Sequence, residues 1–268
     1  MDDGYELWQQ SDIRFVNRHR AEQAAADHLG DALRVTGTGP VESWFFIRKD
    51  EWRLRYNSTN QDSTAAARRV VTVALAALRD HGAVEGWVEK IYEPEVHAFG
   101  GRQAMDAAHR LFHQDSQHVL DYLRLPGPDR RRELSVLLCA AMMRCAGLDW
   151  YEQGDVWARV AGSRPGTGET SEEQVRKLRD AVARLLVADP RSGLTSVPDG
   201  TSDLTTTWLD AFEQAGRMLH LLWSEGRLTR GVRAVIAHHV IFHWNRIGLR
   251  YPTQSALALA AKDAVLGT

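Results

Sequence analysis

The pair Gly100-Gly101 separates two parts of the sequence with different spacings of apolar residues. Before it, three segments are typical of strands. Val41–Arg48 is rich in β-branched and aromatic residues, whereas Trp52–Tyr56 and Val84–Tyr92 alternate with a period of two. After it, every structured segment has a helical repeat or composition. The sequence therefore predicts an α+β fold with a small antiparallel sheet in the N-terminal half and a helix-dominated C-terminal half.

The expected helices are rich in alanine or leucine, and most of them end at glycine or proline. They cover residues 17–35, 63–79, 102–123, 131–145, 149–160, 171–188, 205–225, 229–248 and 254–265. Residues 1–16 are expected to form either a further strand or an arm over the body. The glycine-rich stretch 162–168 is predicted to be a mobile loop, and Ser171 with Gln174 is predicted to open a helix as a capping box.

Composition excludes several classes of function. Lys and Arg number 33 against 35 Asp and Glu, and this net charge of −2 argues against a nucleic-acid partner. The chain contains no apolar run of the ~18 residues that cross a membrane, and its first residues lack a signal-peptide core. Cys139 and Cys145 lack the spacing of a redox or zinc site and are expected to be free thiols. We therefore expect a cytoplasmic protein with no membrane partner.

Two carboxylates lie where the last predicted strand ends. Pro94 stops this strand between Glu93 and Glu95, and Tyr92 and His97 flank the group. A carboxylate at a strand end can act as a general acid or base when burial raises its pKa. The alternative interpretation is a solvated loop.

Two arginines, Arg53 and Arg55, share one face of the second strand. Adjacent guanidinium groups repel each other unless water or an anionic or carbonyl-rich ligand lies beside them. Either this face is the wet outer face of an edge strand, or it contacts such a ligand.

Two helices carry histidines at helical spacing. His109, His113 and Ser116 share a face of the helix after Gly101, a spacing that is compatible with a metal although no third ligand is evident. His239 and His243 share a face of an otherwise apolar helix, where polar groups are costly to bury without partners. Core or surface histidines are the alternative for the first group, and a structural role for the second.

Five motifs, in this order, resemble one known family: Trp44–Arg48, Arg53–Arg55, Tyr92–Glu95, Phe99–Gly101 and His243–Arg246. They resemble the C-terminal, elimination-type domain of lantibiotic dehydratases and, more narrowly, its stand-alone relatives in thiopeptide biosynthesis. The resemblance covers residues from about 40 to 265 and implies a single domain over 1–268.

The resemblance implies one of two activities. The first removes glutamate from glutamylated Ser or Thr. The second joins two dehydroalanines by a formal aza-[4+2] cycloaddition, and loss of water and of the leader peptide then yields a pyridine ring. Elimination domains of this family carry an arginine where this chain has Ala98, which favours pyridine synthase activity. The retained Arg53 and Arg55 keep glutamate elimination as the alternative. A non-catalytic peptide-binding subunit, suggested by nine tryptophans, is a third hypothesis.

The implied partner is a ribosomally made precursor peptide with a leader and a dehydroalanine-containing core, bound by a monomer or homodimer without metal or organic cofactor. The candidate catalytic residues are Tyr92, Glu93, Glu95, His97 and His243. The candidate substrate-binding residues are Arg53, Arg55, His113, Ser116, His239, Asn245 and Arg246.

Overall fold

The structure, a computed structural model, describes residues 7–17, 20–34, 39–166, 172–189, 191 and 202–267. It divides into two compact units. The sheet unit comprises Met1–Pro94 and Phe112–Pro126, and the helical unit comprises Glu95–Leu111 and Gly127–Thr268. The α+β class is confirmed, with the sheet in the N-terminal half. The single domain over 1–268 stays a prediction.

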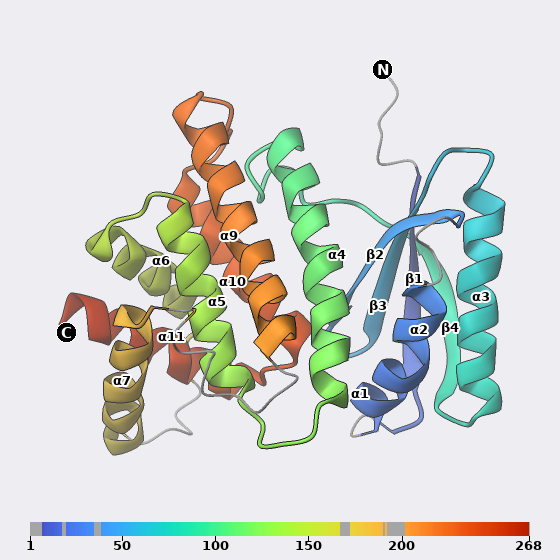
Figure 1. Cartoon of the computed structure of the whole chain (residues 1–268), viewed down its shortest axis with the longest axis horizontal. Coiled ribbons are helices and arrows are strands. Elements are labelled where there is room, and N and C mark those ends of the chain that lie inside the picture. The colour runs from blue at the N-terminus through green and yellow to red at the C-terminus, as the bar shows by residue number, and fades with distance from the viewer. Residues whose placement is uncertain are drawn as a thin grey trace. The chain divides into compact units, whose positions relative to one another are not determined.

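The sheet has four antiparallel strands in the order β2-β3-β1-β4 (Figure 1). They are β1 (Trp8–Phe15), β2 (Val41–Arg48), β3 (Trp52–Ser58) and β4 (Val84–Ile91). The three predicted strands are confirmed. The segment that the sequence left open between strand and arm is a strand, β1, and it pairs with both β3 and β4.

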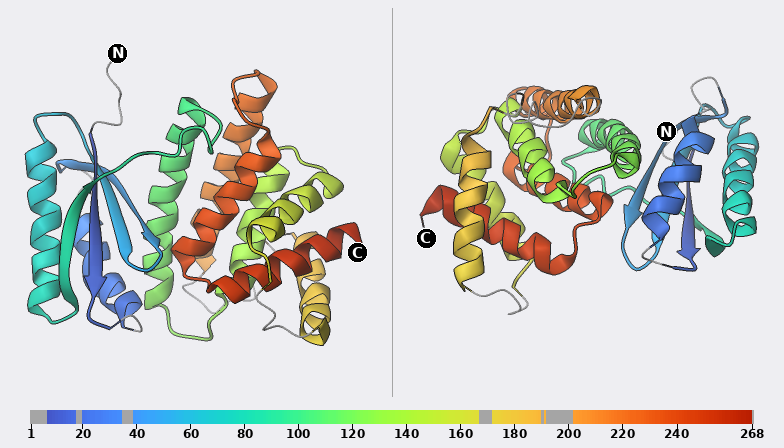
Figure 2. Two further views of the ribbon diagram at one scale, coloured as in Figure 1. Left: turned by 180° about the vertical axis from the view of Figure 1, so that it is seen from behind. Right: turned by 60° about the horizontal axis from the view of Figure 1, so that its bottom comes forward.

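Helices lie against one face of this sheet (Figure 2). They are α3 (Thr64–Asp80) and an N-terminal helical segment made of α1 (Ala21–Ala24), a π-helical turn (Ala25–Leu29) and α2 (Gly30–Arg34). Both predicted helices of this region are therefore confirmed, although the first begins at Ala21 rather than at residue 17. The alanines of the π-helical turn are fully buried, which allows a close approach to α3.

Helix α4 (Arg102–Arg124) belongs to both units, with its first residues in the helical unit and its last in the sheet unit. The other long helices of the helical unit are α5 (Arg131–Cys145), α6 (Trp150–Ser163), α7 (Glu172–Val187), α9 (Ser202–Ser224), α10 (Val232–Ile247) and α11 (Tyr251–Leu266). In this unit α5 packs on α9, α10 on α6, and α11 on both α6 and α7. Most side chains of α5 and α10 are buried, as their apolar sequences predict.

Several helix ends differ from the predicted ones. The last helix begins at Tyr251 rather than at residue 254, because Pro252 occupies the first turn, where its missing N–H group costs nothing. Helix α6 extends through Gly162 and Ser163, which the sequence assigned to a loop. The rest of that loop ends at residues 167–168, and these lie outside the described residues, as does Ser171 of the predicted capping box.

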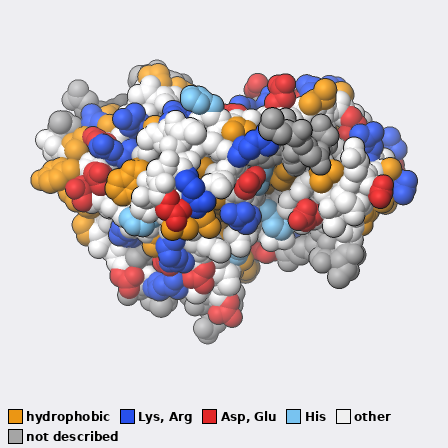
Figure 3. Space-filling view, turned by 90° about the horizontal axis from the view of Figure 1, so that it is seen from above, with side chains coloured by type: hydrophobic (Ala, Val, Ile, Leu, Met, Phe, Trp, Pro, Cys, Tyr) orange, Lys and Arg blue, Asp and Glu red, His pale blue; other side chains and the backbone are white. Residues whose placement is uncertain are grey.

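The surface is consistent with the small net charge. On the face shown in Figure 3, acidic and basic side chains are interspersed rather than gathered by sign. Among the described ranges, every helix is too short or too polar to cross a membrane.

Candidate acid–base site

Tyr92 and Arg55 are fixed against each other in the sheet unit. The Arg55 guanidinium lies 4.4 Å from the centre of the Tyr92 ring and 5.5 Å from that of Phe45, and its Nε donates to Oε1 of Gln10 at 2.8 Å. Arg55 is 8% exposed, and β3 lies between β2 and β1. The interpretation of this face as the wet side of an edge strand is therefore wrong. Arg53, on the same face, is half-buried.

His113 and Ser116 contact the outer edge of β2. This strand pairs on one side only, so the outward-facing groups of Trp44 and Phe46 lack a neighbouring strand. His113 Nδ1 lies 2.9 Å from the carbonyl oxygen of Trp44, and the Ser116 hydroxyl accepts a hydrogen bond of 3.2 Å from the Phe46 N–H. Burial lowers the pKa of His113, and the bond to the Trp44 carbonyl opposes this shift. Both side chains thus stabilise the sheet edge, and a role in substrate binding stays a prediction.

In the helical unit, residues 95–101 form a compact turn that leads into α4. The Phe99 N–H donates to the carbonyl of Glu95 at 3.1 Å. Gly100 and Gly101 have φ values of 88° and 107°, a region that favours glycine. A Cβ atom on Gly100 would also lie 3.0 Å from the Val235 side chain. The glycine pair is therefore needed for the turn that places Glu95.

The Glu95 carboxylate meets an imidazole of α10. Its Oε2 lies 2.8 Å from Nε2 of His238, with 46% of the Glu95 side chain and 23% of the His238 side chain exposed. In the tautomer that carries a proton on Nε2, His238 donates to Glu95 and leaves Nδ1 as a base. A carboxylate that orients an imidazole is a common acid–base arrangement.

Phe99 holds the ring of His238 in place. The phenyl ring is fully buried, with centroid distances of 4.8 Å to His238, 4.9 Å to His239 and 5.0 Å to Phe242. The His238 ring therefore packs against a fixed apolar surface on one side, while its nitrogen reaches Glu95.

A guanidinium group lies on the backbone of Ala98. Arg230 donates from Nη1 to the Ala98 carbonyl at 2.7 Å, and the Thr229 N–H donates to the Gly100 carbonyl at 3.0 Å. The elimination domains that this chain resembles carry an arginine at the position of Ala98. Here a residue 132 positions away supplies a cation beside the same turn.

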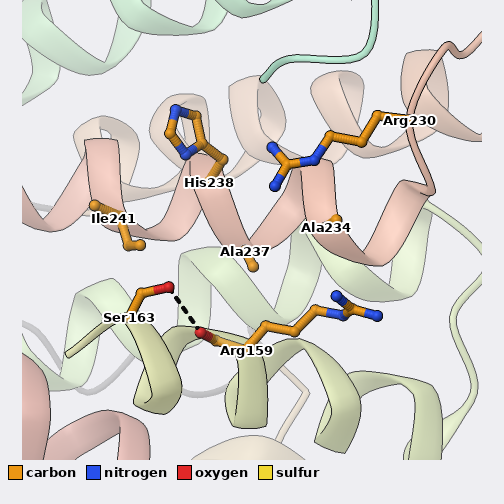
Figure 4. Close-up of a pocket in the computed structure, with 7 residues that line it drawn as sticks. All are labelled: Arg159, Ser163, Arg230, Ala234, Ala237, His238 and Ile241. Atoms are coloured by element: carbon orange, nitrogen blue, oxygen red, sulfur yellow. Dashed lines mark hydrogen bonds between the residues drawn. The ribbon is translucent and has the colours of Figure 1, made fainter. Parts of the chain in front are cut away.

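A pocket of about 210 Å³ opens next to His238, between α6 and α10 (Figure 4). Its lining residues are Arg159, Ser163, Arg230, Ala234, Ala237, His238 and Ile241. Arg230 and His238 lie on the α10 side, and Arg159 and Ser163 on the α6 side. The pocket therefore combines two cations, an acid–base pair at its edge and an apolar floor. Pockets with convergent polar groups of this kind are good candidates for functional sites.

Of the predicted catalytic residues, Glu95 contacts a residue of this pocket, His238. The side chains of Glu93 and His97 are exposed. His243 is 2% exposed and packs 4.9 Å from the ring of Phe212, in the core of the helical unit. Tyr92 lies in the sheet unit.

The substrate-binding candidates of α10 also lie away from the pocket lining. His239 and Arg246 are 3% and 1% exposed, and Asn245 accepts a hydrogen bond of 3.0 Å from Gln254 of α11. Their predicted roles stay predictions. Within the described ranges, no cluster of three or more potential metal ligands is present.

Sequence reasoning missed His238, Arg230 and Arg159. A signal existed for His238, because Ala234, His238 and Ile241 recur at spacings of four and three, which place them on one face of α10. The sequence prediction took His239 instead, because it shares a helix face with His243.

Known proteins share this fold. The model of the family described as lantibiotic biosynthesis dehydratase C-term matches residues 8–265. No curated protein matches the chain significantly.

Three solved structures are similar over almost the whole chain. The tRNA-dependent lantibiotic dehydratase MibB from Microbispora sp. 107891 is 19% identical over 97% of this chain, with a TM-score of 0.72, but the match spans only 28% of MibB. TsrL is 17% identical over 96% of this chain and 93% of its own, with a TM-score of 0.62. The pyridine synthase TbtD from thiomuracin biosynthesis is 15% identical over 97% of this chain and 98% of its own, with a TM-score of 0.68.

At these identities the structural neighbours establish the fold alone, whereas the family model covers nearly every residue and agrees with the five sequence motifs. The chain therefore belongs to the lantibiotic biosynthesis dehydratase C-term family.

Proposed function

We propose that this protein is a pyridine synthase that acts on a ribosomally made precursor peptide. It joins two dehydroalanines of the peptide core by a formal aza-[4+2] cycloaddition and closes a macrocycle. The observation that carries the proposal is the 2.8 Å pair of Glu95 and His238 at the edge of a pocket. Support also comes from the similarity to TbtD, which extends over 98% of that chain.

The reaction needs proton transfers at several points. The amide next to one dehydroalanine first becomes its iminol tautomer, which moves a proton from nitrogen to oxygen. Two C–C bonds then form between this azadiene and the second dehydroalanine. Water leaves from the former carbonyl carbon, and the leader leaves as an amide, so that a pyridine ring remains.

The Glu95–His238 pair can serve these steps. His238 accepts the amide proton at Nδ1 and returns a proton to the departing oxygen or nitrogen, while Glu95 holds the ring through Nε2. A positioned acid or base of this kind contributes about 10²–10⁴ in rate. Binding both dehydroalanines of one peptide together contributes further, roughly 7–11 kcal/mol in well-oriented reactions. The proposed mechanism uses no metal or organic cofactor.

The test is incubation with a leader-bearing peptide that contains two dehydroalanines, followed by mass spectrometry. We expect release of the leader as an amide and appearance of a pyridine macrocycle. Glu95→Gln and His238→Asn should each lower the rate by about 10²-fold or more. Asp155→Asn is the matched control, because this α6 carboxylate pairs with Arg233 and lies outside the pocket lining. A peptide that binds but returns unchanged refutes the proposal.

Glutamate elimination is the second candidate, and one observation favours it. Arg230 places a cation on the Ala98 carbonyl, which weakens the argument that the missing arginine excludes a glutamyl substrate. Loss of glutamate from a peptide with a glutamylated serine would establish this activity. Binding of both peptides with turnover of neither would instead favour a non-catalytic peptide-binding subunit.

The remaining predictions belong to this proposal. The partner is the precursor peptide with its leader, the protein is a monomer or homodimer, and it acts in the cytoplasm. The other candidate site residues, including Tyr92 and Arg53, keep their proposed roles in handling the peptide.

A further inference from the structure

The two arginines of the pocket make no ion pair with the described residues. Arg230 gives one hydrogen bond, to the Ala98 carbonyl, and Arg159 gives none from its side chain within the same part of the chain. Arg233 of α10, by contrast, forms an ion pair with Asp155 of α6. Two guanidinium groups that face one pocket without a carboxylate favour an anionic ligand.

The backbone adds to this positive field. Helix α10 begins at Val232, two residues after Arg230, and Ala234 of its first turn lines the pocket. The first turn of a helix carries the positive end of the helix dipole, although the Ala234 N–H itself donates to the Gly231 carbonyl at 2.9 Å. The Ser163 hydroxyl, by contrast, donates to the carbonyl of Arg159 at 3.0 Å (Figure 4), so the cations and the helix end provide the recognition.

The size and floor of the pocket limit the ligand. The volume of about 210 Å³ is below the ~300 Å³ at which sites for whole small molecules begin. Ala234, Ala237 and Ile241 form apolar walls. The pocket therefore suits a carboxylate on a short aliphatic stem, attached to a larger molecule that stays outside.

We infer that this pocket binds the carboxylate of an acidic side chain of the peptide substrate, through Arg159 and Arg230. The identity of the larger molecule rests on the proposed function. Held in this way, the peptide has one anchor beside the Glu95–His238 pair, which fixes its position relative to the reacting residues.

The test is a titration with N-acetyl-L-glutamic acid α-methylamide, which carries one carboxylate. The neutral control is the glutamine analogue of the same size. Binding is followed through the histidine ring signals in NMR spectra, and the His238 signal is assigned by its loss in His238→Asn. We expect a saturable shift of the His238 signal with the acid only, weakened by rising salt.

Variants locate the binding. Arg159→Gln and Arg230→Gln should each lower the affinity for the glutamic acid derivative by about tenfold or more, as expected when a hydrogen bond to a charged group is lost. Arg233→Gln, in the first turn of α10 and outside the pocket lining, is the matched control and should leave the affinity unchanged. Circular dichroism verifies that each variant is folded, and Arg159→Lys, which keeps the charge, should retain part of the binding.

Equal binding of the glutamine analogue, or unchanged affinity in both pocket variants, overturns the inference. So does the absence of a saturable shift in the unmodified protein. The titration needs no turnover, so its failure leaves the cyclase proposal standing. Intact binding in a protein without cyclase activity refutes only the proposed function.

Discussion

Replacement of Gly216 by alanine should reverse the usual effect of this substitution in a helix. Replacement of an exposed helical glycine by alanine stabilises the helix by about 0.8–1.0 kcal/mol. Gly216, however, lies where α9 packs against α5, and a Cβ atom there would be 2.3 Å from the carbonyl oxygen of Met142 and 2.9 Å from Cβ of Cys145. The first distance is about 1 Å short of ordinary van der Waals contact, which begins at 3.4 Å. Overpacking of this kind costs about 1–3 kcal/mol, occasionally more.

Backbone atoms cannot rotate away, so the cost at Gly216 should lie in the upper part of that range. We expect Gly216→Ala to lower the free energy of unfolding by about 1–2 kcal/mol net, measured by urea denaturation. Gly162→Ala is the matched control, because nothing lies within 4 Å of the added Cβ, and it should gain about 0.5–1 kcal/mol. A Gly216→Ala protein as stable as the original would refute the close contact between α5 and α9.

Three further predictions follow from buried groups. Burial lowers the pKa of His113, so the unfolded chain takes up a proton more readily than the folded one. The contribution of His113 to stability is therefore full above pH 6.5 and falls below it by at most about 1.4 kcal/mol per pH unit. Urea denaturation across this range should show the slope, and His113→Asn should reduce it. Ser116→Ala should lower the free energy of unfolding by about 1–3 kcal/mol in the same assay, because it leaves the Phe46 N–H without its acceptor. Ser135→Ala loses only a bond to its own helix, so it should change the free energy of unfolding little. Burial raises the pKa of Cys145, so its alkylation by iodoacetamide at pH 8 should be slower than that of a free thiol, and a faster reaction would contradict this.

The strands and most helices could be predicted from the sequence because their signals are local. The strand at Val41–Arg48 and the helix at Arg131–Cys145 begin and end where the pattern indicated. Their apolar runs and flanking breakers act over a few residues, so no knowledge of distant contacts is needed. Helix α10 begins at Val232 rather than at Thr229 because Thr229 uses its N–H to bond Gly100, a contact that local patterns do not contain.

The candidate site, like the fold, depends partly on local sequence signals and partly on contacts between distant residues. The sequence by itself determined that Glu95 follows a strand end, that Gly100 and Gly101 permit a tight turn, and that a histidine-bearing helix comes late in the chain. Only the tertiary structure decided which histidine meets the carboxylate. Successive residues of a helix point about 100° apart, so α10 buries His239 while it presents His238 to Glu95. The cation beside Ala98 comes from Arg230 for the same reason, because folding joins residues that no local pattern connects.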